Sequence, residues 1–478
     1  MNEPGKLGGV AQRGLRATDL DAVRRQIGRD PTTAFTVVAR CSGGHPLVIR
    51  NAPIDANGEP FPTTFWLTCP EAVKAIARVE SEGWIAKLND RVHEDEAFDD
   101  ALEAAHRAYA DERAEEWEAA RSWGGVAGTR TGVKCLHAHY AYRLAGGDDP
   151  VGAWVAERIE PVHPGQRPGR VAAVDQGTNS CRLLIVEPGA GPDDPPTELA
   201  RDMVITRLGQ GVERTGALDA EALTRTALVL GRYGRRARAL GAETIRVAAT
   251  SAVRDAANRD RFADIVRIQT GAALEVIDGE REAGLSFLGA TQGLDPALGP
   301  FAVMDIGGGS TEFVTGALPG AAERAISVQL GSVRQTERGI PSDPPTPEDL
   351  ATFERDGAAA FDDVEPAVPV GDARTLVSCA GTATTMLAVH LGLERYDPDL
   401  IHRQWFSVED AEETLLRLAR MTNAARAALP VMVPGRGDVI VAGGVILVTA
   451  MRRFGFERTL VSETDILDGL AAELLRIR

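Results

Sequence analysis

Two short stretches of the sequence place an aspartate just before glycines and hydroxyl residues, in the same order. The first stretch begins at Asp175 and the second at Asp305, 130 positions later in the chain. Each follows an apolar run typical of a buried strand, and strands tolerate glycine poorly, so the glycines indicate turns or a close approach of the backbone. Exposed N–H groups in such turns bind phosphate oxygens, and a nearby aspartate can hold a metal ion. The repetition suggests a duplicated domain with two phosphate-binding turns facing a cleft.

The residue types in these stretches predict how a phosphate ligand would be held. Asp175, Asp305 and Glu312 are the candidate ligands of Mg²⁺ (or Mn²⁺), because hard cations take oxygen ligands. Arg254 lies near a predicted helix N-terminus and is suited to a bidentate contact with phosphate. Each residue alone also has an ordinary structural interpretation, such as an Asx turn for the aspartates. The predicted phosphate-binding residues are Gly177, Thr178, Asn179, Ser180, Arg254, Gly307, Gly308, Gly309 and Ser310.

A site that hydrolyses a bound phosphate group also needs a carboxylate that orients or deprotonates the attacking water. Glu282 follows a predicted strand at the start of a helix, so its side chain can reach the cleft, and Asp305 and Glu312 are further catalytic candidates. Glu280 is an equally good helix-start residue, since the helix dipole favours acidic side chains there. Arg281 precedes Glu282, and we expect its positive charge to lower the basicity of Glu282.

A second group of potential ligands lies in the N-terminal third of the chain: Cys69, Cys135, His137 and His139. Cys135 and His139 are one helical turn apart, and Cys69, Cys41 or His45 would complete a tetrahedral metal site. The sequence has no Cys-x₂-Cys pair, and cysteine is among the residue types most often buried in protein cores. We therefore favour packing roles for these residues over a metal site.

The alternation of predicted strands and helices from residue 171 onward is the pattern of an α/β layer fold. The N-terminal third has short β-like runs and predicted helices over 72–88 and 98–121, which indicate a small α+β domain. Between them, residues 160–169 are rich in Pro and Gly without periodicity. We expect an N-terminal domain at 18–160, a linker at 161–169, and two subdomains at 170–298 and 299–462. A C-terminal helix within 463–478 is expected to complete the first subdomain.

Composition excludes several classes of function. The net charge of −17 argues against nucleic-acid binding. No apolar run approaches the roughly 18–20 residues of a membrane span, and the first 15 residues lack the apolar core of a signal peptide. Five scattered cysteines suggest a reducing, cytoplasmic location. No Gly-Lys-Ser/Thr motif is present, which excludes a Walker-type nucleotide site.

Several spaced motifs make residues 170–478 resemble the Ppx/GppA phosphatase family of exopolyphosphatases and guanosine pentaphosphate phosphohydrolases. The duplicated hairpins are similar to the actin, sugar-kinase and Hsp70 architecture, which implies two RNase H-like domains around a cleft. The family's catalytic glutamate matches Glu282, and this match separates it from Glu280. Residues 18–160 resemble a bacterial family of unknown function, DUF501. The phosphatase motifs are DQGTNSCRL (175–183), RLGQGV (207–212), ATSAVRDAAN (249–258), GEREA (279–283), DIGGGSTE (305–312) and LGSVR (330–334); those of DUF501 are FPT (61–63), LTCP (67–70) and VKCLHA (133–138).

The resemblance implies an Mg²⁺-dependent hydrolase that releases orthophosphate from the ends of inorganic polyphosphate. Removal of the 5′ phosphate from guanosine pentaphosphate (pppGpp), a stringent-response nucleotide, uses the same chemistry and stays open as an alternative. A non-catalytic sensor of (p)ppGpp or polyphosphate, and an ATP-dependent kinase of the same fold, are further alternatives. A homodimer is compatible with the sequence, which does not determine the oligomeric state.

Overall fold

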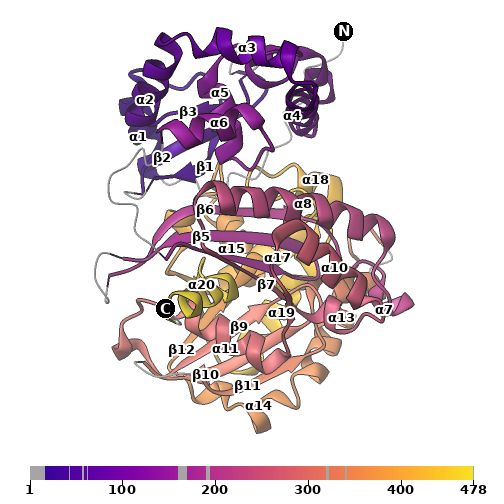
Figure 1. The fold of residues 1–478 in the computed structure, drawn as a ribbon. Coiled ribbons are helices and arrows are strands. Elements are labelled where there is room, and N and C mark those ends of the chain that lie inside the picture. Colours follow the sequence, from indigo (N-terminus) through magenta and orange to yellow (C-terminus); the bar gives the residue numbers. More distant parts are fainter. Residues whose placement is uncertain are drawn as a thin grey trace.

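Three β-sheets organise the chain in the computed structural model (Figure 1). The structure describes residues 17–41, 44–55, 59–61, 63–159, 169–189, 194–318, 322–339 and 342–476. Residues 161–168 of the expected linker lie outside the described residues, and the domain boundaries expected from the sequence stay predictions. Among the described residues, no helix is both long and apolar enough to cross a membrane.

The N-terminal part is a small α+β unit, as expected. Its antiparallel sheet has the order β1-β2-β3. The sequence predicted one helix over 72–88, but the structure has two helices there, with Gly83 between them. The φ of Gly83 is +79°, a backbone conformation that favours glycine and interrupts the helix. The expected helix over 98–121 ends at residue 114 and is followed by a 3₁₀ segment. The elements are α1 (Ala17–Ile27), β1 (Phe35–Arg40), β2 (Pro46–Asn51), β3 (Phe65–Leu67), α2 (Pro70–Ser81), α3 (Trp84–Glu94), α4 (Glu96–Ala114), η1 (Glu118–Trp123), η2 (Val126–Gly128), α5 (Leu136–Leu144) and α6 (Pro150–Ile159).

The second unit, here called subdomain I, is built on a five-stranded sheet of order β6-β5-β4-β7-β8. β4 and β5 form an antiparallel hairpin, and β7 and β8 are parallel to β4. All six residues of β4 are buried, as a central strand covered on both faces requires. The elements are β4 (Val171–Gln176), β5 (Ser180–Glu187), β6 (Thr197–Ile205), α7 (Val212–Thr215), α8 (Ala220–Ala239), β7 (Thr244–Ala249), α9 (Ser251–Arg254), α10 (Arg259–Thr270), β8 (Leu274–Val276), α11 (Gly279–Ala290) and η3 (Pro296–Leu298).

The third unit, subdomain II, repeats this strand order as β11-β10-β9-β12-β14 and adds β13 at the edge. The repeated order, with a hairpin followed by parallel strands, confirms the duplicated α/β architecture. The elements are β9 (Phe301–Ile306), β10 (Thr311–Gly316), β11 (Ala322–Val328), α12 (Ser332–Gly339), α13 (Pro347–Ala360), α14 (Val364–Ala367), η4 (Val370–Asp372), β12 (Thr375–Cys379), α15 (Ala380–His390), α16 (Pro398–Ile401), β13 (Gln404–Ser407), α17 (Val408–Ala419), α18 (Asn423–Ala427), α19 (Ile440–Arg453), β14 (Arg458–Val461) and α20 (Ile466–Arg476).

The last helix, α20, returns to subdomain I, where Figure 1 shows it in yellow against the magenta strands. Its apolar residues share a core cluster with β4, β5 and Leu285 of α11. The backbones of α11 and α20 touch, because a Cβ on Gly289 would overlap the backbone oxygen of Asp465. This contact fixes α11, and with it Glu282, against the sheet.

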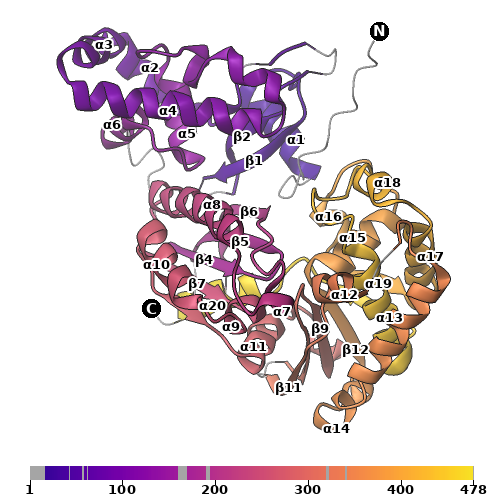
Figure 2. The ribbon, with the colours of Figure 1, turned by 90° about the vertical axis from the view of Figure 1, so that its right-hand side faces the viewer.

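The N-terminal unit packs onto α8 and β6 of subdomain I (Figure 2). One continuous apolar cluster runs from its helices into subdomain I. A charged network adds to this contact, with Glu112 of α4 3.4 Å from Arg232 of α8 and 3.8 Å from Arg50 of β2. The N-terminal unit is therefore fixed on the phosphatase-like part and is not merely tethered to it.

Candidate active site

The two hairpins match residue for residue across their strands. In the first hairpin, Asp175 lies opposite Arg182, and in the second, Asp305 lies opposite Glu312. Both pairs are thus offset by the same 130 positions that separate the two aspartates. The duplicated position opposite the aspartate therefore carries a cation in one copy and an anion in the other.

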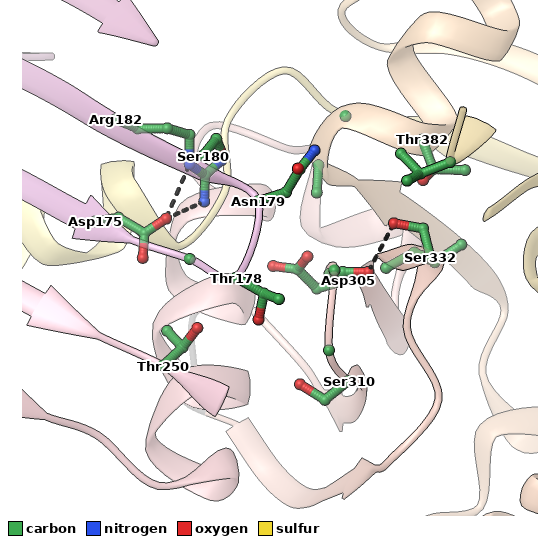
Figure 3. Close-up of a pocket in the computed structure, with 18 of the residues that line it drawn as sticks. Asp175, Thr178, Asn179, Ser180, Arg182, Thr250, Asp305, Ser310, Ser332 and Thr382 are labelled. Atoms are coloured by element: carbon green, nitrogen blue, oxygen red, sulfur yellow. Dashed lines mark hydrogen bonds and ion pairs between the residues drawn. The ribbon is translucent and has the colours of Figure 1, made fainter. Parts of the chain in front are cut away.

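A cleft lies between the two turns, and Figure 3 shows its wall with Asp175 and Arg182 in ionic contact. The structure brings most of the predicted site residues to this cleft, including Glu282 and both aspartates. Arg254 and Glu312 do not line it directly, but Arg254 lies 3.6 Å from Glu282, and Glu312 lies across the hairpin from Asp305. The lining consists of Asp175, Gly177, Thr178, Asn179, Ser180, Arg182, Met203, Thr250, Glu282, Asp305, Ile306, Gly307, Gly308, Gly309, Ser310, Ser332, Ala380, Gly381, Thr382, Arg436, Val439, Ile440 and Ile466.

The turn glycines are needed because the two subdomains approach closely here. A Cβ on Gly309 would lie 2.7 Å from Oγ of Ser251 and 2.9 Å from Oγ1 of Thr178, both in subdomain I. The N–H groups of Gly177 and Gly307 each donate to a serine carbonyl within their own turn, at 3.0 Å. Binding of phosphate by backbone N–H groups therefore rests on the residues that follow these two glycines.

Four carboxylates are buried around the cleft: Asp175, Glu282, Asp305 and Glu312, with 1–8% of each residue exposed. Oδ1 of Asp175, Oε2 of Glu282 and Oε2 of Glu312 have no hydrogen-bond partner among the described residues. Asp305 accepts from Oγ of Ser286 at 2.7 Å, and Glu312 accepts from Oγ of Ser327 at 2.7 Å. Buried charged oxygens without donors are costly, so this arrangement calls for protons or a cation.

Burial and mutual repulsion raise the pKa values of these carboxyls. The pKa of Asp305 rises to about 6, first through burial and then through Asp465. Burial and the charge of Asp305 raise the pKa of Glu312 to about 7. Glu282 has its pKa raised well above the usual value by burial, Glu312 and Asp305, in that order. A carboxyl with a raised pKa is a stronger base than a solvated one, as general-base catalysis near neutral pH requires.

Arginines neutralise only part of this negative charge. Nη2 of Arg182 lies 2.6 Å from Asp175, and its Nη1 pairs with Asp465 in the loop before α20. Arg254 donates to the carbonyl of Ile277 at 3.0 Å and stays within ion-pair distance of Glu282. A polyanionic ligand would therefore need further positive charge in this cleft, such as that of a metal ion.

The expectation that Arg281 lowers the basicity of Glu282 is wrong. Nη1 of Arg281 donates to Oε1 of Glu473 on α20 at 2.7 Å, so the guanidinium binds a different carboxylate. The pKa of Glu282 is raised, and the cation that opposes this rise is Arg254. Adjacent residues on a helix point in different directions, and sequence proximity did not imply contact here.

The carboxylates of the cleft fit a magnesium-type ion with few protein ligands. Their unpartnered oxygens are hard donors of the kind that Mg²⁺ takes. Among the described residues, no three carboxylate, histidine or cysteine ligand atoms of this cleft lie within 4.8 Å of one another. Mg²⁺ commonly binds one or two carboxylates and completes its coordination with water and substrate phosphates, so this spacing agrees with its usual mode.

Several residues of the cleft were missed from the sequence. Thr382 at the N-terminus of α15 and Arg436 in the loop before α19 both line it. Arg436 donates to the carbonyl of Gly381 at 2.9 Å and to Oγ1 of Thr385 at 2.7 Å, which fixes the strand-to-helix loop. Thr382 follows the end of β12 within three residues, as Thr250 directly follows the end of β7, and a threonine at both strand-to-helix connections was the available signal.

The four N-terminal residues Cys69, Cys135, His137 and His139 do not form one cluster. His139 is fully buried, and its Nδ1 lies 2.7 Å from Asp149. Cys69 is the N-cap residue of α2, at the opposite end of that helix from Glu80. Cys135 and His137 do come together, but the third group beside them is Glu80. Two of the four candidate ligands, Cys69 and His139, therefore lie apart from the pair formed by Cys135 and His137.

Comparison with known proteins confirms both resemblances seen in the sequence. Residues 184–476 match the Ppx/GppA phosphatase family, and residues 37–157 match a protein of unknown function, DUF501. Exopolyphosphatase 2 of Mycobacterium tuberculosis is 44% identical over 318 residues, which cover 64% of this chain and 98% of that protein. A solved exopolyphosphatase from Cytophaga hutchinsonii has a TM-score of 0.60 at 25% identity, covering 64% of this chain and 98% of that one. The Aquifex aeolicus Ppx/GppA family member has a TM-score of 0.56 at 29% identity, covering 65% and 98%.

Proposed function

Since this chain belongs to the Ppx/GppA phosphatase family, and is thus a hydrolase of phosphoanhydride bonds, we propose that its substrate is inorganic polyphosphate, from which it releases terminal orthophosphate. The observation that carries this proposal is the buried Glu282 carboxylate. Its Oε2 has no hydrogen-bond donor and lines a cleft between two glycine turns. That is the position required of a base that accepts a proton from water beside a bound phosphate.

In the proposed reaction, Glu282 accepts a proton from the attacking water. The water oxygen forms a bond to the terminal phosphorus as the bridging P–O bond breaks. The terminal group is released as orthophosphate, and the bridging oxygen leaves with the shortened polyphosphate chain. Thr178, Ser310 and the turn residues 308–309 would hold the phosphoryl oxygens during this step. Arg254 would balance charge on Glu282, from which it lies 3.6 Å away. The raised pKa of Glu282 increases its basicity relative to a solvated glutamate.

We propose Asp175, Asp305 and Glu312 as the residues that would hold or orient Mg²⁺ (or Mn²⁺). When bound, the ion would supply positive charge to the phosphoryl oxygens. Unpartnered oxygens on Asp175 and Glu312 support this assignment. Asp175 already pairs with Arg182, which makes Asp305 and Glu312 the more available ligands.

Two observations favour polyphosphate over pppGpp. The M. tuberculosis relative at 44% identity is named an exopolyphosphatase. The described residues that line the cleft include no aromatic side chain, so a guanine base would find no ring to stack on there. A polyphosphate chain needs only charge and hydrogen-bond donors. A homodimer and a cytoplasmic location are also consistent with this function.

The test is a phosphate-release assay on the purified full chain, with polyphosphate and pppGpp as competing substrates in Mg²⁺. We expect faster release from polyphosphate, and a loss of about 10²–10⁴-fold in kcat for Glu282→Gln, the range attributed to a general base. Glu280→Gln is the matched control, because Glu280 is exposed in the same helical turn. Preferential hydrolysis of pppGpp would overturn the substrate assignment, and equal kcat in wild type and Glu282→Gln would overturn the role of Glu282.

A further inference from the structure

Three side chains of the N-terminal unit gather outside the phosphatase cleft. Glu80 lies in the last turn of α2, Cys135 is the N-cap residue of α5, and His137 lies in the first turn of α5. One ligand atom from each residue, a carboxylate oxygen, Sγ and a ring nitrogen, lies within 4.8 Å of the other two. The cluster is half-buried, with 23% of the Glu80 and His137 side chains exposed.

Backbone groups hold this cluster in a fixed orientation. Nε2 of His137 lies 3.0 Å from the carbonyl oxygen of Val73, which can only accept, so Nε2 carries a hydrogen. The other ring nitrogen, Nδ1, faces Sγ of Cys135 at 3.8 Å and Oε1 of Glu80 at 3.2 Å. The N–H of Leu136 donates to the same Oε1 at 2.7 Å. A ligating histidine typically has its remote nitrogen anchored on a carbonyl in this way.

The donor set matches a transition-metal site. A thiolate, an imidazole nitrogen and a carboxylate oxygen are all ligands of Zn²⁺, and sites with three protein ligands leave a fourth position for water or another ligand. The thiolate excludes Mg²⁺ as the natural occupant, because Mg²⁺ prefers oxygen ligands. The partial exposure of the cluster gives an ion access from solvent.

We propose that the N-terminal unit binds one Zn²⁺-class ion through Cys135 Sγ, His137 Nδ1 and the Glu80 carboxylate, with one coordination position left open. The site lies on α2 and α5, the two helices that form its walls, and the ion would join their ends. It is independent of the proposed phosphatase function. Its ligands also differ in kind from the oxygen donors of the cleft.

The chain offers a matched control in the same unit. Sγ of Cys41 lies 3.9 Å from Nδ1 of His45, nearly the spacing of Cys135 and His137. Among the described residues, however, this pair belongs to no group of three ligand atoms within 4.8 Å. If the third ligand and the fixed histidine create the site, Cys41→Ser should bind metal like the wild type.

The experiment uses the purified full chain, stripped of metal and titrated with Zn²⁺ and Co²⁺. We expect one tightly bound Zn²⁺ per chain and a thiolate-to-cobalt charge-transfer band, in the wild type and in Cys41→Ser. Cys135→Ser should lose the band, and His137→Ala should weaken Zn²⁺ binding by more than about 100-fold, beyond the effect of losing an outer contact. Glu80→Gln should retain the band with weaker binding, because Gln can still accept from the Leu136 N–H.

The cobalt spectrum of the wild type decides the proposal even if a variant does not fold. Any Co²⁺ in the carboxylate cleft would give no thiolate band, so the two sites are distinguished by spectrum. Absence of the band in the Co²⁺-loaded wild type would overturn the proposal. So would its persistence in folded Cys135→Ser, or its loss in Cys41→Ser.

Discussion

Glu312→Gln should stabilise the metal-free protein at alkaline pH while it removes activity. Glu312 is 1% exposed, and its Oε1 accepts from Ser327 while its Oε2 has no donor. Glutamine keeps the oxygen that accepts from Ser327 and replaces the unpartnered oxygen by a neutral NH₂ group. The substitution therefore removes the charge and leaves the shape and this hydrogen bond in place. Glu312 belongs to the proposed metal site, so stability and phosphate release should change in opposite directions.

The magnitude follows from the pKa of Glu312. Burial and Asp305 raise this pKa from 4.5 to about 7 in the folded protein. Because the folded pKa lies above the unfolded one, the carboxyl contributes stability that is fully present below the unfolded pKa and is lost as pH rises through the folded pKa. At roughly 1.4 kcal/mol per pKa unit, the loss is about 3 kcal/mol, most of it between pH 5 and 8. The glutamine variant does not incur this loss.

Thermal unfolding in EDTA at pH 5 and pH 8 measures the effect. We expect the Tm of the wild type to fall by roughly 3 °C more than that of Glu312→Gln between these two pH values. Glu280→Gln, an exposed substitution of the same kind, should follow the wild type. An identical change in Tm for the wild type and Glu312→Gln would refute the reasoning, since it would mean that the Glu312 charge costs nothing in the fold.

Three further predictions concern the cleft. Gly309→Ala should reduce kcat by at least about 10-fold, because the new Cβ would lie 2.7 Å from Oγ of Ser251. Gly284→Ala is the control and should retain the wild-type kcat, because a Cβ at Gly284 would have no neighbouring atom within 4 Å. Arg182→Met should lower the free energy of unfolding, measured by urea denaturation at pH 7, by about 3–5 kcal/mol. The reason is that buried Asp175 and Asp465 lose the cation that contacts both of them. Adding Asp175→Asn should recover part of this loss, because it removes one of the two charges. Dialysis against EDTA should abolish phosphate release and Mg²⁺ should restore it; full activity in EDTA would argue against a metal at Asp305.

The duplicated fold was predictable because the same pattern of apolar strands and glycine turns occurs in both copies. The hairpins around Asp175 and Asp305 have apolar strands on both sides of a glycine turn, and the strands form as the pattern indicates. The family of unknown function in the N-terminal third was likewise recognisable from motifs. What the motifs did not show is that its core continues into that of subdomain I.

Long-range packing explains what the sequence did not predict. Residues 440–453 form the buried helix α19, which was not predicted from the sequence. Gly443 and Gly444 are tolerated there because Thr382, Met386 and Leu415 occupy the space that a Cβ would need. Likewise, nothing in the order of residues indicated that Arg281 would turn to Glu473, almost 200 positions away. Helix propensity and sequence motifs depend on residues that are close together in the chain. The packing of α19 and the contact of Arg281 with Glu473 join segments that are far apart in the chain, so neither could be predicted in this way.

The duplication also explains why the chemistry is asymmetric. Asp175 and Asp305 occupy equivalent positions, but the residue opposite is Arg182 in the first copy and Glu312 in the second. The first aspartate is paired with Arg182 within its own hairpin, and Arg182 also contacts Asp465 in the loop before α20. The second aspartate faces a like charge, and burial together with this repulsion raises the pKa values of both Glu312 and Glu282. The hairpin of subdomain II therefore places a second carboxylate near Glu282 of α11, whereas the hairpin of subdomain I pairs its aspartate with an arginine.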